Sequence, residues 1–313
     1  MDTLRNKKLL IYGTGAIGGY YGAMLVKAGF DVTFIARGKN YEVMKEKGLT
    51  FIHDGEREII PVNVVRNCRD NSLQGEFDYI FICVKARDTK NAIREIKFNV
   101  GENTSVVSFQ NGVENEEIIG SVIGEEKVIG ANLYVNSWLV EPGVVEVLGS
   151  YYIKIGALDG IETKQVKDLQ KIFELSGINC QISPDITADL WHKLVWNAAV
   201  NPVSVLTKKT LDEMLDDAGT YNLIKGIMQE VRDTAIANGI NIRRDTVEYN
   251  LECVKNYKKG IITSMLQDFE AGKPIELEEI VGVVVRKAKG VSIPVPNIEN
   301  VYNKLSSLVN VCA

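Results

Sequence analysis

The feature that most constrains the fold is a glycine-rich stretch directly after an apolar run near the start of the chain. Residues Lys8–Tyr12 have the pattern of a short buried strand, and Gly13-Thr14-Gly15-Ala16-Ile17-Gly18-Gly19 follows, before a helical pattern that runs to about Ala28. Glycines at this spacing allow a tight turn and let the backbone approach a pyrophosphate, which then lies at the helix N-terminus. Because strand and helix flank the glycines, the stretch predicts a dinucleotide-binding site rather than an ordinary glycine-rich turn.

Short apolar runs alternate with helical patterns over about the first 180 residues, which is typical of βαβ units on a parallel sheet. Two later runs, Gly143–Val147 and Tyr152–Gly156, are expected to pair antiparallel at a sheet edge. From Asp185 onward a 3.6-residue period dominates. We therefore expect an α/β fold, with a Rossmann-type doubly wound sheet in residues 1–183 and an all-helical domain in residues 184–313. The other expected strands are Asp31–Ala36, Tyr79–Val84, Ser105–Phe109 and Val128–Ala131.

Composition excludes several classes of protein. The 313 residues carry a net charge of −5 with no basic block, which argues against nucleic acid as a partner. No apolar run reaches the ~20 residues of a membrane helix, and Met1–Lys8 is too polar for a signal peptide. The five cysteines are odd in number and form no C-x-x-C, so a disulfide scaffold and a metal site are not expected. We expect a cytoplasmic protein without metal or membrane.

The end of the second strand indicates the kind of dinucleotide. NAD sites usually place an Asp or Glu there, about 20 residues after the glycines, to bind the ribose 2′-hydroxyl. This strand ends Phe34-Ile35-Ala36-Arg37-Gly38-Lys39, with no acid. Arg37, with Lys39 beside it, suits a 2′-phosphate because a guanidinium binds phosphate as a fork. NADP is therefore expected over NAD, the alternative being that Arg37 is a solvated surface charge.

Two more polar residues follow apolar runs in the same way, Lys85 after Tyr79–Val84 and Asn111 after Ser105–Phe109. Ligands of doubly wound sheets bind outside the carboxyl ends of the strands. We expect Gly13, Arg37, Lys85 and Asn111 to converge on one crevice, although each taken alone could be an ordinary loop residue.

A helix is expected over Asp185–Leu206, after the start signal Ser183-Pro184. Lys193, Asn197 and Asn201 are spaced i, i+4, i+8 and share one face of it, flanked by apolar residues. Polar groups beside a buried face need partners or a ligand, since an unpaired one costs about 1–3 kcal/mol. The alternative is a partly exposed polar stripe.

Reduction of a carbonyl requires a proton donor, and the chain has only two histidines, His53 and His192. His192 lies about 100° around the helix from Lys193, so the two cannot face the same ligand. Lys193 has the polar companions, and an ammonium can both polarise a ketone and protonate it. Lys193 is the better candidate, and His192 is expected to be structural.

Two further segments carry polar residues. Ser264 and Asp268 share a helix face, and Glu276 lies where a new helix begins after Pro274. A carboxylate there could accept a hydrogen bond from a substrate hydroxyl or from Lys193. The alternative is an acid favoured at a helix start by the dipole.

Together these motifs resemble the ketopantoate reductase family (2-dehydropantoate 2-reductase). The resemblance covers nearly the whole chain, and its motifs occur in the family's order. They are G-x-G-A-I-G-G, I-A-R-G, V-K-A at Val84–Ala86, Q-N-G at Gln110–Gly112, W-H-K-L-x-W-N-x-x-x-N-P at Trp191–Pro202 and S-M-L-Q-D at Ser264–Asp268.

The resemblance implies roles for these residues. It makes Lys193 the general acid, has Asn197, Asn201 and Ser264 hold the substrate, and places Glu276 at the substrate hydroxyl and the cofactor. It also places Lys85 and Asn111 beside the nicotinamide half, with Asn111 next to the substrate. The helical domain would be similar to that of 6-phosphogluconate dehydrogenase.

The activity implied is the NADPH-dependent reduction of 2-dehydropantoate to (R)-pantoate, in pantothenate and coenzyme A synthesis. Two alternatives stay open: a reductase of another branched 2-keto acid, because aliphatic pockets discriminate by only ~1–3 kcal/mol per methylene, and a non-catalytic NADP(H) sensor. The loop Tyr134–Trp138 could line the pocket and change the substrate. The expected partner is a small 2-keto acid, and a homodimer is one assembly open to the chain.

Overall fold

The computed structural model describes residues 2–70, 73, 75–149, 151–255 and 259–312. Contacts group the chain into two units, an α/β unit of residues 1–110 and 115–186 and a helical unit of residues 111–114 and 187–313. The chain therefore changes unit after Gln110, after Glu114 and after Ile186. The domain boundary expected between residues 183 and 184 lies close to the last of these changes.

An eight-stranded sheet forms the centre of the α/β unit, in the order β12-β11-β8-β7-β6-β1-β2-β5. All neighbours are parallel except β8 and β11, so the doubly wound Rossmann-type sheet is confirmed, as is the antiparallel pairing of the run at Tyr152. The strands are β1 (Lys8–Tyr12), β2 (Asp31–Ile35), β5 (Asn63–Val65), β6 (Tyr79–Ile82), β7 (Ser105–Ser108), β8 (Val128–Tyr134), β11 (Tyr152–Ala157) and β12 (Cys180–Ile182).

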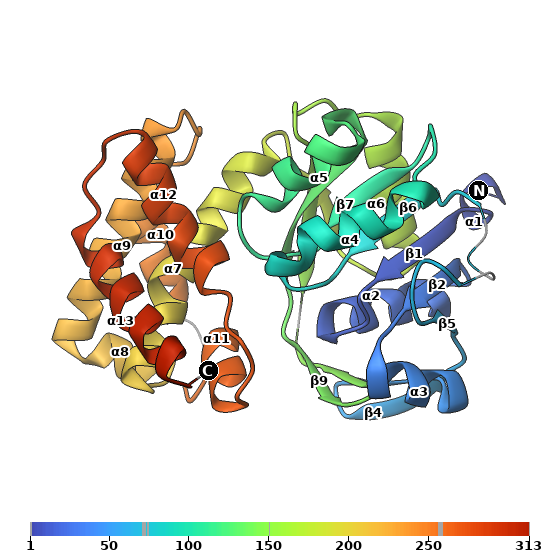
Figure 1. The fold of residues 1–313 in the computed structure, drawn as a ribbon, viewed down its shortest axis with the longest axis horizontal. Coiled ribbons are helices and arrows are strands. Elements are labelled where there is room, and N and C mark those ends of the chain that lie inside the picture. The colour runs from blue at the N-terminus through green and yellow to red at the C-terminus, as the bar shows by residue number, and fades with distance from the viewer. Residues whose placement is uncertain (1, 71–72, 74, 150, 256–258, 313) are drawn as a thin grey trace. The chain divides into compact units, whose positions relative to one another are not determined.

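Both faces of this sheet are buried, as expected for parallel strands covered by helices. Along β1, Leu9 and Ile11 belong to one hydrophobic core, whereas Leu10 and Tyr12 belong to the core on the opposite face. The helices of this unit are α1 (Asp2–Arg5), α2 (Ala16–Lys27), α3 (Gly38–Lys47), α4 (Thr89–Ile96), α5 (Asn115–Ile123) and α6 (Lys164–Leu175). Figure 1 shows α4 and α5 side by side over the sheet.

A second sheet of four strands has the order β4-β3-β10-β9. The run Gly143–Val147 is expected from the sequence to pair antiparallel at a sheet edge. As β10 it does pair antiparallel with the edge strand β9, but it lies one strand in from the edge of this second sheet and pairs parallel with β3 on its other side. The four strands are β3 (Leu49–His53), β4 (Glu56–Ile60), β9 (Ser137–Glu141) and β10 (Val144–Val147). The sequence did not predict β3, β4 or β9; β4 is largely exposed, β9 is half-exposed or exposed, and neither has a long apolar run to indicate it.

Helix α2 lies between the two sheets, and its glycines make this possible. A Cβ at Gly22 would lie 2.2 Å from Cε1 of Phe34 in β2, and one at Gly19 would lie 2.4 Å from Cγ2 of Val145 in β10. These two glycines are three residues apart and lie side by side on the helix surface, so α2 meets both sheets there with no room for a side chain. Figure 1 shows α2 between β2 of the main sheet and the second sheet around β9.

Helix α7 (Ile186–Thr207) is buried along most of its length in the helical unit. Its neighbour α9 carries Glu230, whose carboxylate accepts the Asn297 and Ile298 backbone N–H groups at 2.9 Å each and so caps α13. Among the residues described, no helix is long and apolar enough to span a membrane. The other helices are α8 (Leu211–Asp216), α9 (Ala218–Ala237), α10 (Thr246–Lys255), α11 (Ser264–Glu270), a π-helical turn (Glu278–Gly282), α12 (Val283–Gly290) and α13 (Pro296–Cys312).

The close packing of α2 predicts that Gly22→Ala lowers the free energy of unfolding by about 1–3 kcal/mol, the usual cost of overpacking. The methyl group would collide with the fully buried ring of Phe34. Urea unfolding followed by circular dichroism measures this. Gly290→Ala is the matched control, because a Cβ there meets nothing within 4 Å. Equal stability of the two variants would contradict the packing argument.

Candidate functional site

The glycine turn lies at the carboxyl edge of the main sheet. Tyr12 is in register with Ile35 of β2 and Ile82 of β6, so the segments that follow all three strands leave the sheet at one edge. Gly13 has a φ of +99°, and a Cβ on it would lie 2.7 Å from Cγ1 of Val84. Only glycine fits this left-handed, crowded position.

The start of α2 is open where the turn ends. Gly15 is the N-cap residue of α2, and a Cβ on it would meet nothing within 4 Å. A glycine here leaves the N–H groups of the first turn without a side-chain cap and accessible to an anion. This backbone cradle, from Gly13 to the first turn at Ala16–Gly18, fits the pyrophosphate of a dinucleotide.

The side chain of Thr14 points away from that opening. Its hydroxyl donates to the Ile35 carbonyl at 3.1 Å and is buried. The backbone carbonyl of Thr14 accepts a hydrogen bond from the side-chain amide of Asn40. The side-chain oxygen of Asn40 accepts a hydrogen bond from the Gly143 N–H at 2.6 Å. Asn40 thus ties the glycine turn to the segment before β10, a role that sequence reasoning missed.

Arg37 is exposed at the mouth of a pocket of about 220 Å³. Its Nη2 donates to the Tyr12 hydroxyl at 2.7 Å and lies 3.3 Å from Oε2 of Glu95, to which that hydroxyl donates at 2.6 Å. Burial, helped by the Glu95 carboxylate, raises the pKa of Tyr12. The lining residues are Tyr12, Arg37, Val84, Asp88, Asn91, Ala92, Arg94 and Glu95.

Glu95 matters because the end of β2 carries no acid. An acid nevertheless reaches the Arg37 guanidinium from α4, 58 positions further along the chain. The pocket therefore holds both a cation suited to a 2′-phosphate and a carboxylate suited to a ribose hydroxyl.

Lys85 and Gln110 end neighbouring strand segments. Lys85 is half-buried and precedes the 3-10 turn Ala86–Asp88. The Gln110 amide donates to the Val84 carbonyl at 2.9 Å and to the Thr89 hydroxyl at 2.8 Å, which fixes the segment that carries Lys85. Of the four residues expected to converge, Gly13, Arg37 and Lys85 belong to the α/β unit and Asn111 to the helical unit.

The face of α7 that carries Lys193, Asn197 and Asn201 is not an exposed polar stripe. Both asparagines are buried, and Lys193 is half-buried. Buried polar groups in native proteins have hydrogen-bond partners, so this face is not a solvated stripe.

Ser264 is held near the same face by a pair of hydroxyl groups. Oγ of Ser204 lies 2.5 Å from Oγ1 of Thr263 and donates to the Asn201 carbonyl at 2.7 Å. Thr263 caps α11, which begins at the exposed Ser264. The Ser204 hydroxyl therefore links the backbone of α7 at Asn201 to the residue that precedes Ser264.

Glu276 completes the group of polar residues in the helical unit. It is buried just before the π-helical turn and acts electrostatically on Lys193. Burial lowers the pKa of Lys193 to about 8, and the Glu276 carboxylate opposes that shift. Perturbed titrations of this kind are typical of functional sites.

His192, one residue earlier, is engaged elsewhere. Its Nδ1 forms a hydrogen bond with the Thr246 hydroxyl, and its ring lies 5.3 Å from that of Tyr249. Thr246 and Tyr249 both belong to α10. His192 therefore faces α10 from a different face of α7 than the one that carries Lys193.

Comparison with known proteins covers both units. The family described as Ketopantoate reductase PanE/ApbA matches residues 9–160, and its C-terminal part matches residues 185–309. The 2-dehydropantoate 2-reductase of Mesorhizobium japonicum is 31% identical over 94% of this chain and 95% of its own length. The crystal structure of the Methylococcus capsulatus 2-dehydropantoate 2-reductase superimposes with a TM-score of 0.88 at 31% identity, over 98% of each chain.

A more distant likeness shows the fold alone. D-mandelate dehydrogenase, solved with NADH and anilino(oxo)acetate, has a TM-score of 0.90 at 22% identity, over 97% of this chain and 99% of its own. The family match, by contrast, spans most of the sequence and agrees with the motifs of both units. The chain therefore belongs to the ketopantoate reductase family, PanE/ApbA, whose named members are oxidoreductases acting on a CH–OH group.

Proposed function

We propose that this protein reduces 2-dehydropantoate to (R)-pantoate with NADPH, a step in pantothenate and coenzyme A synthesis. The proposal rests mainly on one face of α7. There the pKa of Lys193 is lowered, the Glu276 carboxylate acts on its charge, and Asn197 and Asn201 are buried. The relatives from Mesorhizobium japonicum and Nostoc, both named 2-dehydropantoate 2-reductase, support this substrate.

The α/β unit would hold the cofactor. The backbone from Gly13 to Gly18 would receive the pyrophosphate, Arg37 the 2′-phosphate, and Lys85 the nicotinamide half. Bound NADPH supplies a hydride to the keto carbon. Glu95 would compete with the 2′-phosphate for Arg37. The preference for NADPH over NADH then depends on how readily the Arg37 guanidinium exchanges the Glu95 carboxylate for the phosphate.

The helical unit would hold the keto acid. Lys193 polarises the ketone and donates the proton that the developing alkoxide needs. The polar groups of the substrate are bound by Asn197, Asn201 and Ser264. Asn111, on the segment Asn111–Glu114, lies beside the substrate as well. The Glu276 carboxylate accepts a hydrogen bond from the terminal hydroxyl and keeps Lys193 protonated to a higher pH.

Lys193→Ala should lower kcat by about 10²–10⁴-fold, the usual contribution of general acid catalysis, with NADPH binding retained.

In the wild type, kcat/KM should fall as the pH rises through about 8, because only the ammonium form of Lys193 can donate a proton. Glu276→Gln should move this fall to lower pH, since the carboxylate raises the pKa of Lys193. NADPH oxidation and a fluorescence titration measure both. A Lys193→Ala variant with near-normal kcat would return His192 to consideration, and turnover absent from the wild type would favour the sensor.

Arg37→Asp should shift the ratio of kcat/KM for NADPH and NADH towards NADH, because the 2′-phosphate loses its guanidinium. Glu95→Gln should shift the ratio the other way by freeing Arg37 from its ion pair. Arg66→Gln is the control, since Arg66 is an exposed arginine paired with Glu42 and does not line this pocket. An unchanged ratio in Arg37→Asp would make Arg37 a surface residue.

Glu276→Gln should also separate 2-dehydropantoate from other branched 2-keto acids. A hydrogen bond to a charged group is worth ~1.5–3 kcal/mol, so kcat/KM for 2-dehydropantoate should fall roughly tenfold more than for 2-keto-3,3-dimethylbutyrate, which lacks the hydroxyl. Equal losses on the two substrates would mean that the hydroxyl is not recognised by Glu276. A general branched 2-keto-acid reductase would then be the better description.

A further inference from the structure

The segment Asn111–Glu114 has an unusual place in the fold. It follows β7 and Gln110 and precedes α5, which all belong to the α/β unit, yet its own contacts assign it to the helical unit. Val113 packs against the hydrophobic core of that unit. Gly112, with a φ of +103°, allows the sharp turn that this path requires.

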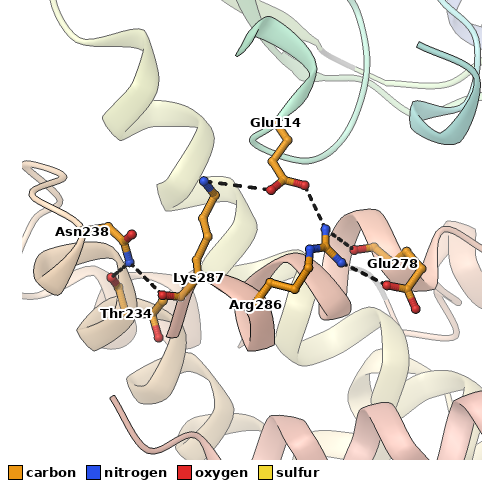
Figure 2. A network of polar contacts seen from close by, with 6 residues as sticks. All are labelled: Glu114, Thr234, Asn238, Glu278, Arg286 and Lys287. Atoms are coloured by element: carbon orange, nitrogen blue, oxygen red, sulfur yellow. Dashed lines mark hydrogen bonds and ion pairs between the residues drawn. The ribbon is translucent and has the colours of Figure 1, made fainter. Parts of the chain in front are cut away.

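Polar contacts of Glu114 anchor the end of the segment on α12 (Figure 2). Oε2 of Glu114 accepts a hydrogen bond from Nη2 of Arg286 at 2.9 Å, and Oε1 lies 4.0 Å from Nζ of Lys287. The Lys287 carbonyl in turn lies 3.5 Å from the Asn238 side-chain amide, at the end of α9. The anchor point is therefore part of the packed helices.

The same guanidinium holds a second segment. Nη1 of Arg286 lies 3.0 Å from Oε2 of Glu278, and Nη2 lies 3.5 Å from the Glu278 carbonyl. The Tyr302 hydroxyl donates to the other carboxylate oxygen of Glu278. Glu278 begins the π-helical turn and follows Glu276 by two residues, whereas Glu114 follows Asn111 by three.

The chain is shaped to admit this contact. A Cβ at Gly282 would lie 2.5 Å from Oε2 of Glu278 and 3.1 Å from Nη1 of Arg286. Any side chain there would push the ion pair apart. A π-helical turn is rare and often occurs at functional sites, and here it brings Glu278 and Gly282 together beside α12.

These ion pairs are poorly placed to stabilise the fold. The side chains of Arg286, Glu114 and Glu278 are 50%, 33% and 55% exposed, and exposed pairs contribute little to stability. These ion pairs are more important for geometry than for stability. One planar guanidinium binds two carboxylates from segments 164 positions apart and so fixes where the segments lie.

We propose that Arg286 is a positioning residue, which fixes Asn111 relative to Glu276 by binding Glu114 and Glu278 at once. This inference rests on the proposed function, because it takes Asn111 and Glu276 to act on the substrate. Because Asn111 is taken to bind the substrate, a segment displaced by about 1 Å should weaken substrate binding while the fold persists.

Arg286→Met tests this. The KM for 2-dehydropantoate should rise roughly tenfold, with a smaller change in kcat and an unchanged melting temperature. Arg286→Lys should recover only part of the loss, because one ammonium cannot fork between two carboxylates. Arg243→Gln, which breaks the exposed Arg243–Asp245 pair of the same unit, is the matched control and should leave KM unchanged. A KM in Arg286→Met that equals the control would overturn the proposal.

Glu114→Gln gives an independent arm, since it removes the segment's side of the contact and leaves the Arg286–Glu278 pair intact. It should raise KM, and in the Arg286→Met background its further effect should be much smaller, because the 4.0 Å contact with Lys287 is then what is left to lose. Fully additive losses would overturn the proposal. Hydrogen exchange in the peptide spanning residues 111–114 should be faster in both variants than in the wild type and in Arg243→Gln. Unchanged exchange would also overturn it. A wild-type enzyme that reduces no 2-keto acid would refute the proposed function instead, and the exchange arm would still report on the anchoring.

Discussion

In the helical unit the constraint is electrostatic: a partly buried cationic side chain, Lys193, lies close enough to the buried Glu276 to be affected by its charge. Removing an ammonium from solvent disfavours its charged form, and Lys193 retains a pKa of about 8 because the buried Glu276 carboxylate opposes the effect of burial. The position of each group depends on the other. Helix α7 must be buried for Lys193 to be desolvated, and the chain before the π-helical turn must bring Glu276 close enough to compensate. A general acid needs a pKa near the working pH, so this balance supports the role in proton transfer that we propose for Lys193.

In the α/β unit the corresponding constraint is steric. Helix α2 lies against two sheets, and it can do so only where glycines replace side chains, at Gly22 against Phe34 and at Gly19 against Val145. The same run of glycines begins with the turn at Gly13–Gly15, which is crowded at Gly13 and open at Gly15. One short stretch of sequence therefore sets both the packing of the helix and the exposure of its first N–H groups. This explains why a motif associated with phosphate binding also carries information about the whole fold.

Sequence alone predicted the elements that repeat a period or carry local turn chemistry. The central strands, the start of α2 and the long helix α7 were within a few residues of their observed bounds. The strand β9 was missed because its residues are half-exposed and pair with chain far away. Glu95 beside Arg37 was missed for a related reason. Nothing in the end of β2 indicates that an acid from α4 will reach it, and only the register of the sheet brings the two together. Asn40, Glu114 and Arg286 belong to the same class of contacts, which connect distant segments and leave no periodic trace in the sequence.

Gln110 and Asn111 are neighbours in the sequence but are held by different units of the fold. Gln110 is fixed to the α/β unit by hydrogen bonds to the Val84 carbonyl and the Thr89 hydroxyl. Asn111, the next residue, begins the segment that Val113 and Glu114 attach to the helical unit. A change at Arg286 should therefore reach Asn111 through a segment of four residues and leave Gln110, Lys85 and the glycine turn undisturbed. Under the proposed function, cofactor preference would depend on Arg37 and Glu95 in the α/β unit and substrate affinity on the helical unit, so the two could vary independently. Such a separation would let one fold keep its cofactor while its substrate changes.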